Sequence, residues 1–212
     1  MKIMMFIGWI AAAFVCGALP FSVWVGRLAL GKDIRAYGDG NPGATNVLRA
    51  GGKWLGAIAA VLDASKGLIP VGLATFVMHF TAFELAAIAL APILGHAFSP
   101  FLKFKGGKAV GVTFGIWVGL TIWEAPTVLG LMLAYWFQFV TVSGWAVMLA
   151  LSSLGMYLVL AHPDPVLLLV LVGNILILAW THRSDLRQPL GLRKLYDRTV
   201  STASSKPQSI LR

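Results

Sequence analysis

Glycines and polar side chains are concentrated in the segment from residue 33 to residue 49. Its three glycines leave backbone N–H groups open near an expected helix start, and such groups attract phosphate together with a helix N-terminus. Arg49 can add a charged, forked hydrogen bond to an anion. The candidate phosphate-binding residues here are Gly38, Gly40, Asn41, Gly43, Thr45 and Asn46. The same residues also fit a tight turn whose arginine lies among lipid headgroups.

A second segment, residues 95–108, ends in Gly106-Gly107-Lys108 just before an apolar stretch. Two glycines and a lysine at a helix start again suit an anion. The segment is not a Walker A loop, because position 102 is Leu where the first Gly should be and position 109 is Ala instead of Ser or Thr. An anchor at the cytoplasmic membrane surface explains part of its remaining positive charge.

A third segment follows the last apolar stretch and contains His182, Arg183 and Asp185. A histidine there could transfer a proton or bind a phosphate. An ordinary basic end to a membrane helix explains these residues equally well.

The sequence contains no pattern typical of a metal site, a serine nucleophile or nucleic-acid binding. The chain has no metal-ligand spacing and no serine nucleophile elbow, so we expect neither a metal nor a cofactor. The formal net charge of +9 does not indicate nucleic-acid binding, because no basic patch interleaved with aromatic residues accompanies it. Charged residues are nearly absent from the apolar stretches, which argues against an ion or proton pathway.

The composition indicates that membrane helices position these three segments. Of the 212 residues, 58% are hydrophobic and 12% are charged, whereas a soluble domain is nearer half apolar and a quarter charged. We therefore expect an all-α integral membrane protein with a single transmembrane domain over residues 1–200 and a polar tail over residues 201–212. The apolar run after Lys2 is expected to be a retained first helix and not a cleaved signal peptide.

The positions of Lys and Arg predict the topology. After Lys2 they fall within residues 27–66, 103–108 and 183–212, with none in the two intervals between these clusters. If all three clusters are cytoplasmic, each interval must contain an even number of spans. The outer loops then carry Glu84, Glu124 and Asp164 but no Lys or Arg.

This argument predicts about seven transmembrane helices, with the N-terminus outside and the C-terminus in the cytoplasm. Proline and glycine mark the breaks between them. The expected spans are about 5–28, 67–81, 83–97, 108–123, 126–141, 145–161 and 165–181. An alternative has three longer helices between residues 109 and 182, which would place the basic tail outside, against the charge rule.

Within residues 43–62, the part after Trp54 is apolar, and this apolar part lies between Arg49 and Lys66. A spanning helix here would move Lys66 to the outside, so we expect an interfacial or re-entrant helix. Asp63 and Lys66 are one turn apart and are expected to form an ion pair at the membrane surface.

Together the three segments resemble the bacterial glycerol-3-phosphate acyltransferases that use acyl phosphate, the PlsY type. The likeness covers nearly the whole chain, in order and spacing. The matching stretches are Gly38-x-Gly40-Asn41-x-Gly43-Ala44-Thr45-Asn46-Val47-Leu48-Arg49, Asp63-x-x-Lys66-Gly67, Gly95-His96-x-Phe98, Phe101-Leu102-x-Phe104-Lys105-Gly106-Gly107-Lys108 and His182-Arg183.

The resemblance implies a seven-span fold and transfer of a fatty acyl group from acyl phosphate to the 1-hydroxyl of glycerol 3-phosphate, giving lysophosphatidic acid for phospholipid synthesis. It also implies a functional link to the enzyme that makes acyl phosphate. The distribution of Lys and Arg places the active site on the cytoplasmic side. The implied catalytic residues are Asp39, Arg49, Lys108, His182 and Asp185. The implied substrate-binding residues add His96, Lys105, Gly106, Gly107 and Arg183 to those of the first segment.

The chain departs from the family pattern at two places. Asp39 stands where the family usually has Ser, and Asp185 where it usually has Asn. A carboxylate beside a phosphate is repelled unless a cation lies between them, so we expect Arg49, Arg183 or Lys108 to offset them. The alternatives are a divergent member with a different acceptor, or a non-catalytic or transport-like protein on the same scaffold.

Overall fold

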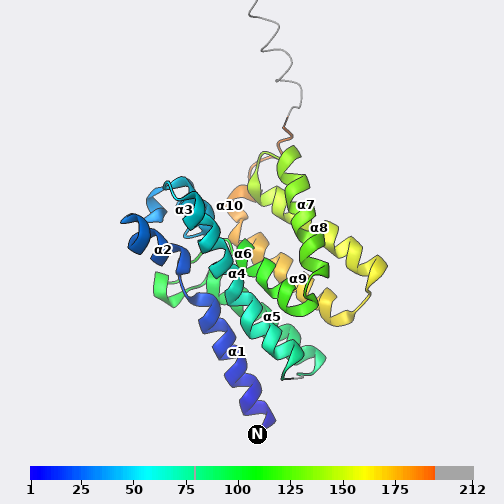
Figure 1. Cartoon of the computed structure of the whole chain (residues 1–212). Helices are drawn as coiled ribbons and strands as arrows, with labels where there is room; N and C mark the ends of the chain where they lie inside the picture. Colours follow the sequence, from blue (N-terminus) through cyan, green and yellow to red (C-terminus); the bar gives the residue numbers. More distant parts are fainter. Residues whose placement is uncertain (79, 194–212) are drawn as a thin grey trace, which may run out of the picture.

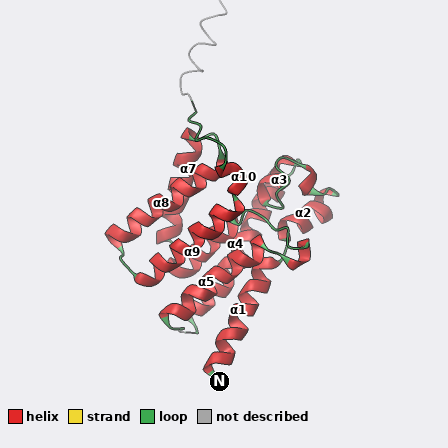
Figure 2. Cartoon of the chain, turned by 180° about the vertical axis from the view of Figure 1, so that it is seen from behind, coloured by secondary structure: helices red, strands yellow, loops and turns green. Residues whose placement is uncertain are grey.

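The computed structural model describes residues 1–78 and 80–193. In that part of the chain the secondary-structure elements are all helices, and a single isolated β-bridge joins Val140 to Leu192 (Figures 1 and 2). The expected all-α class is confirmed. The expected polar tail, residues 201–212, lies outside the described residues.

The helices follow one another with short connections. In chain order they are α1 (Lys2–Ala18), α2 (Phe21–Leu30), η1 (Ile34–Ala36), α3 (Ala44–Arg49), α4 (Lys53–Phe76), α5 (Ala82–Ala97), η2 (Pro100–Leu102), α6 (Val110–Thr121), α7 (Glu124–Phe139), α8 (Ser143–Ala161), α9 (Pro165–Thr181) and α10 (Arg183–Leu186).

Among the described residues, four stretches are long and apolar enough to cross a membrane, namely Lys2–Leu30, Lys53–Phe76, Ala82–Leu102 and Ser143–Ala161. Two shorter apolar helices, Val110–Thr121 and Pro165–Thr181, pack among them. Between residues 110 and 181 the chain forms four helices, and not the three longer ones of the alternative topology.

The first expected span, 5–28, is interrupted at Leu19 and Pro20. Pro20 has no N–H to continue the helical hydrogen bonds, so α1 ends at Ala18 and α2 starts in a new direction. The carbonyl of Ala18 accepts from Ser99 Oγ at 2.6 Å, and that of Leu19 accepts from Lys66 Nζ at 2.8 Å.

The prediction of an interfacial or re-entrant helix over residues 43–62 is wrong. Only the short α3 is separate, and residues 53–62 are the first half of the 24-residue helix α4, which continues through the expected span at 67. The error came from treating Lys66 as a charge at the cytoplasmic surface. A lysine neutralised inside the protein does not report topology, because its charge has a partner.

The Asp63–Lys66 ion pair forms, with 2.7 Å between Lys66 Nζ and Asp63 Oδ1, but not at the membrane surface. Both side chains are buried, at 1% exposure for Lys66 and 4% for Asp63. They face α2 and α5 through contacts with Ser22 and His96.

Helices α4 and α6 approach each other closely because α6 has a glycine at every fourth position. A Cβ on Gly115 would collide with the carbonyl of Ala64, and one on Gly119 would lie 2.8 Å from the backbone nitrogen of Gly72. Small residues at this spacing allow membrane helices to pack backbone against backbone. The contact fixes the start of α6, and with it Lys108, against α4.

The three segments singled out by their chemistry lie at the same end of the bundle. Figures 1 and 2 show α2, α3 and α10 at the end away from the N-terminus of α1. The acidic residues Glu84, Glu124 and Asp164 begin or cap helices at the other end. The helices thus bring distant parts of the chain together around one site.

Candidate active site

The buried side chain of Asn46 holds the first segment together through hydrogen bonds. Its Nδ2 donates to Asp39 Oδ1 at 3.0 Å and to the carbonyl of Asn41 at 2.9 Å, and its Oδ1 accepts from Arg49 Nη1 at 3.1 Å. Gly38 has a φ of +58°, and a Cβ there would collide with the Arg49 side chain. The glycine therefore serves both the left-handed turn and the arginine's close approach.

The second segment folds back onto the end of α5. The N–H of Gly106 donates to the carbonyl of Ala97 at 3.2 Å, and the N–H of Gly107 donates to the carbonyl of His96 at 3.1 Å. These two N–H groups are therefore engaged within the chain. The glycines are needed for a second reason, because a Cβ on either would collide with His96 or Ala97.

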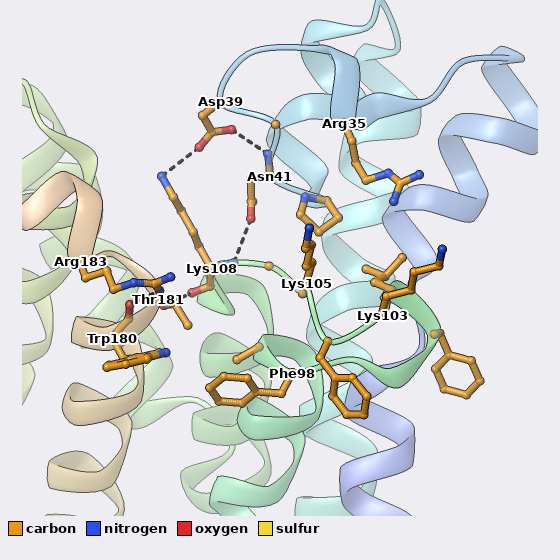
Figure 3. A pocket seen from close by; sticks show the side chains of 18 of the residues that line it. Arg35, Asp39, Asn41, Phe98, Lys103, Lys105, Lys108, Trp180, Thr181 and Arg183 are labelled. Carbon is orange, nitrogen blue, oxygen red and sulfur yellow. Dashed lines mark hydrogen bonds and ion pairs between the residues drawn. The ribbon is translucent and has the colours of Figure 1, made fainter.

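Asn41 joins the first segment to the second. Its Oδ1 accepts from the backbone N–H of Lys108 at 3.0 Å. The third segment reaches the same residue, since Thr181 Oγ1 donates to the Lys108 carbonyl at 3.3 Å. Lys108 is thus held through its backbone from both sides, as Figure 3 shows.

The Lys108 ammonium lies between the two carboxylates that depart from the family pattern. Its Nζ is 2.9 Å from Asp39 Oδ2 and 3.0 Å from Asp185 Oδ2. Asp185 Oδ2 also accepts from Ser143 Oγ at 2.9 Å. Of the cations expected to offset these carboxylates, Lys108 contacts both, and Arg49 forms a longer ion pair with Asp39, at 3.8 Å from its Oδ1.

These contacts keep all three groups ionised. Burial raises the pKa of Asp39, but its hydrogen bond and ion pair with Lys108 outweigh burial and lower the pKa to about 2. Burial also raises the pKa of Asp185, but the hydrogen bonds from Lys108 and Ser143 outweigh burial and lower this pKa. Burial lowers the pKa of Lys108, yet the two carboxylates together raise it above its ordinary value.

His182 lies beside this cluster and is 1% exposed. Its Nδ1 is 2.9 Å from the carbonyl of Leu178, which can only accept, so the ring proton is on Nδ1 and the lone pair is on Nε2. Burial lowers the pKa of His182 and so favours the neutral imidazole. The side chain can accept a proton or a hydrogen bond through Nε2.

A cavity of about 910 Å³ opens between the three segments. Basic and apolar side chains both line it (Figure 3). Figure 3 shows Phe98 and Trp180 on the side of the helices, with Asp39 and Arg35 on the opposite side. The basic residues are Arg27, Arg35, Lys103, Lys105, Lys108 and Arg183, and the apolar residues include Phe98, Phe101, Leu102, Phe104 and Trp180. Such a cavity suits an amphiphile with an anionic head.

All but one of the residues expected from the sequence line the cavity or adjoin its lining. Those that line the cavity are Asp39, Gly40, Asn41, Lys105, Gly106, Gly107, Lys108 and Arg183. Those that contact a lining residue or adjoin one in the chain are Gly38, Gly43, Asn46, Arg49, His96, His182 and Asp185. Thr45 is exposed and lies outside the lining.

Several residues at the site were not among those expected from the sequence. Arg27, Arg35 and Trp180 line the cavity, and Ser143 donates to Asp185. The expected spans 126–141 and 145–161 leave residues 142–144 on the same side as the three segments, and this placement is a signal for Ser143.

Comparisons with known proteins agree on one family. A family model described as glycerol-3-phosphate acyltransferase matches residues 7–190. The chain is 38% identical over 183 residues to a glycerol-3-phosphate acyltransferase of Anaeromyxobacter dehalogenans, covering 84% of this chain and 90% of that one. It is 39% identical over 197 residues to glycerol-3-phosphate acyltransferase 1 of Thermotoga maritima, covering 85% and 96%.

The fold also matches solved structures. The crystal structure of PlsY, an integral membrane glycerol 3-phosphate acyltransferase, in its glycerol 3-phosphate form superposes with a TM-score of 0.78. The two chains are 26% identical, and the match covers 92% of this chain and 98% of PlsY. The lysophosphatidic acid form of the same protein gives a TM-score of 0.75 at 26% identity, covering 86% and 90%.

Proposed function

Because this chain belongs to the glycerol-3-phosphate acyltransferase family, we propose that its basic and apolar cavity holds both substrates of an acyl transfer. The protein is a membrane acyltransferase of phospholipid synthesis that acts on glycerol 3-phosphate. The donor is acyl phosphate, and the acyl group goes to the 1-hydroxyl of glycerol 3-phosphate. The product is lysophosphatidic acid.

The position of Lys108 carries this proposal. Its ammonium lies where the three segments meet, and its side chain lines the cavity beside Arg183 and Lys105. Both substrates bear a phosphate, and cations in a partly dry cavity stabilise phosphate charge far more than cations in water. The phosphates lie among the basic side chains, and Lys108 contacts the phosphate that leaves.

The acyl chain lies along the apolar part of the cavity. Phe98 and Phe101 are partly exposed there, and Trp180 stacks under the Arg183 guanidinium, 5.0 Å from its carbon to the ring centre. An exposed apolar rim next to basic residues allows a chain to enter from the lipid while its head stays among cations.

The reaction needs no nucleophile from the protein. The oxygen of the glycerol 3-phosphate 1-hydroxyl forms a bond to the acyl carbon, and the bond between that carbon and the phosphate oxygen breaks. The released phosphate takes the hydroxyl proton. The protein holds the two substrates in line and stabilises the developing charge.

Acyl transfer by the purified protein tests this function. With acyl phosphate and radiolabelled glycerol 3-phosphate, label is expected to enter lysophosphatidic acid in step with phosphate release. A parallel reaction with an acyl thioester as donor should form no product. Product from the thioester alone would show that the donor is wrong, and product from neither donor would favour the non-catalytic alternative.

A different acceptor is the second candidate function, and the carboxylates at positions 39 and 185 favour it. Both lie on the Lys108 ammonium and occupy the cation that a phosphate would use. An acceptor with a hydroxyl or an amine and no phosphate would not be repelled by them. The same assay with a panel of alcohols and amines separates this candidate from glycerol 3-phosphate.

We infer that the protein crosses the membrane about seven times, with the cavity facing the cytoplasm. The seven helices are α1, α4, α5, α6, α7, α8 and α9. The support is the distribution of charge, since the cavity's arginines and lysines lie at one end and Glu84, Glu124 and Asp164 lie at the other. A cytoplasmic cavity also meets acyl phosphate where it is made, so an enzyme that phosphorylates fatty acyl groups is the expected functional partner.

Reporter fusions test this topology. Fusions at Gly51, Lys105 and Arg193 are expected to read cytoplasmic, because the basic loops stay inside. Fusions at Thr81, Glu124 and Asp164 are expected to read external. A cytoplasmic reading at Asp164 would exclude the seven-span arrangement.

A further inference from the structure

A buried polar cluster lies behind the second segment and has no place in the mechanism above. It consists of Ser22 of α2, Asp63 and Lys66 of α4, and His96 of α5. Lys66 is 1% exposed and His96 is 8% exposed, and neither lines the cavity. Buried ionisable groups among membrane helices are costly and are usually kept for a functional reason.

The Lys66 ammonium has three acceptors around it. They are Asp63 Oδ1 at 2.7 Å, the Leu19 carbonyl at 2.8 Å and His96 Nδ1 at 2.9 Å. An ammonium has N–H groups and no lone pair, so it can only donate. It hydrogen-bonds the Leu19 carbonyl and His96 Nδ1, whereas Asp63 Oδ1 is its ion-pair partner and has no hydrogen bond of its own among the described residues. Asp63 is held in turn by Ser22, whose hydroxyl donates to Oδ2.

This geometry fixes the tautomer of His96. An ammonium can only donate, so Nδ1 must present its lone pair and the ring proton must be on Nε2. A second proton on Nδ1 would face the Lys66 charge at 2.9 Å. His96 is therefore a neutral imidazole with a single defined N–H.

The opposite side of the ring faces the turn that carries Lys108. A Cβ on Gly107 would collide with His96 Nε2 and would lie 3.3 Å from Asn41 Oδ1. That oxygen accepts from the Lys108 N–H, and the His96 carbonyl accepts from the Gly107 N–H. The Nε2 edge of the imidazole therefore packs against Gly107, directly beside the residue whose N–H the Asn41 oxygen accepts.

We propose that Asp63 and Lys66 are positioning residues for the acyl transfer, acting through His96 to hold the Gly106–Gly107 turn and so Lys108 in place. The inference rests on the proposed function of Lys108. It assigns the buried pair to the site without direct contact with a substrate. A misplacement of Lys108 by about 1 Å is enough to cost on the order of tenfold to a hundredfold in rate.

The test replaces both members of the pair at once, as Asp63→Asn with Lys66→Met. Removing one charge alone would leave the other buried and unpaired, which could prevent folding. The double variant removes both charges at similar volume, and the oxygen of the introduced amide can still accept from Ser22. Lys53→Met is the matched control, since Lys53 is an exposed lysine at the start of the same helix.

Nitrogen-15 NMR of the imidazole groups reports the tautomer directly. The chain has four histidines, so the spectrum of His96→Gln identifies the signals of His96. The wild-type protein and Lys53→Met are expected to show a protonated Nε2 and a bare Nδ1. The double variant should lose this single tautomer, while its thermal unfolding and its elution volume stay close to those of the wild type.

Kinetics complete the test. We expect kcat/KM of the double variant to fall by about tenfold to a hundredfold, with Lys53→Met unchanged. A wild-type proton on Nδ1 overturns the proposal. So does a lost tautomer with unchanged kcat/KM, or a lower kcat/KM with the tautomer preserved. If the wild type transfers no acyl group, the proposed function fails and the positioning role fails with it, while the spectrum still decides the tautomer.

Discussion

Lys108→Ala is expected to lower kcat for acyl transfer by a factor on the order of 10²–10³. The ammonium is the one described group in direct contact with both Asp39 and Asp185, and it would stabilise the charge of the departing phosphate. Its removal also leaves two carboxylates near the place where phosphates bind, which adds repulsion. Steady-state kinetics with saturating acyl phosphate measure the loss.

Two further variants show whether the loss is specific. Lys53→Ala removes an exposed lysine at the same end of the bundle and should leave kcat within about twofold, as expected for a surface charge. Arg49→Ala should have an effect between these two, because Arg49 holds Asn46 at 3.1 Å and lies outside the cavity lining. Equal effects of all three substitutions would mean that the basic segments only anchor the protein to the membrane.

Asp39→Ser combined with Asp185→Asn is expected to tighten glycerol 3-phosphate binding by about tenfold or more. In the wild type each carboxylate forms an ion pair with the Lys108 ammonium. The charge-assisted hydrogen bond that a phosphate would gain is worth about 1.5–3 kcal/mol, and about 1.4 kcal/mol corresponds to tenfold in affinity. Serine and asparagine still offer neutral oxygens to Lys108, so the segment should keep its shape. The KM for glycerol 3-phosphate and direct binding measurements report the change.

The control for this pair removes two negative charges at the other end of the molecule. Glu84→Gln with Asp164→Asn changes the net charge by the same amount, and the introduced asparagine can still cap α9. It should leave the KM unchanged. If instead the Asp39 and Asp185 replacements reduce wild-type activity on glycerol 3-phosphate, the carboxylates assist this acceptor and the repulsion argument is wrong. Gain of glycerol 3-phosphate activity with loss of another acceptor would identify the protein as a divergent member.

The sequence could predict that the three basic segments meet, because the spacing of Lys and Arg places them at one end of the bundle. It also showed that Asp39 and Asp185 need a cation. It could not choose among the three candidates, since Lys108 is selected by contacts across the fold. Its Nζ meets Asp185, which is 77 residues away in the chain.

Two features were beyond local reasoning. By its sequence position Lys66 resembles a charge that marks the cytoplasmic side of the membrane, because its partners Leu19 and His96 are distant in the chain. For this reason the prediction for residues 43–62 is wrong. The glycines at 106 and 107 suggest free N–H groups, but both N–H groups bond to the end of α5. In each case the deciding partner lies on another helix, and neither residue spacing nor composition identifies it.

The end of α1 has a consequence for how the protein is assembled during synthesis. The carbonyls of Leu19 and Ala18 take donors from Lys66 and Ser99, which lie 47 and 81 residues later in the chain. When the first helix enters the bilayer, neither donor has been made. The Leu19 carbonyl can still accept from the nearby Phe21 N–H, but an unsatisfied Ala18 carbonyl in hydrocarbon would cost several kcal/mol. Until Ser99 is made, water or lipid headgroups must supply that hydrogen bond. The first helix therefore keeps this end at the membrane surface and completes its packing only after the ribosome has delivered α4, α5 and the residue that follows them.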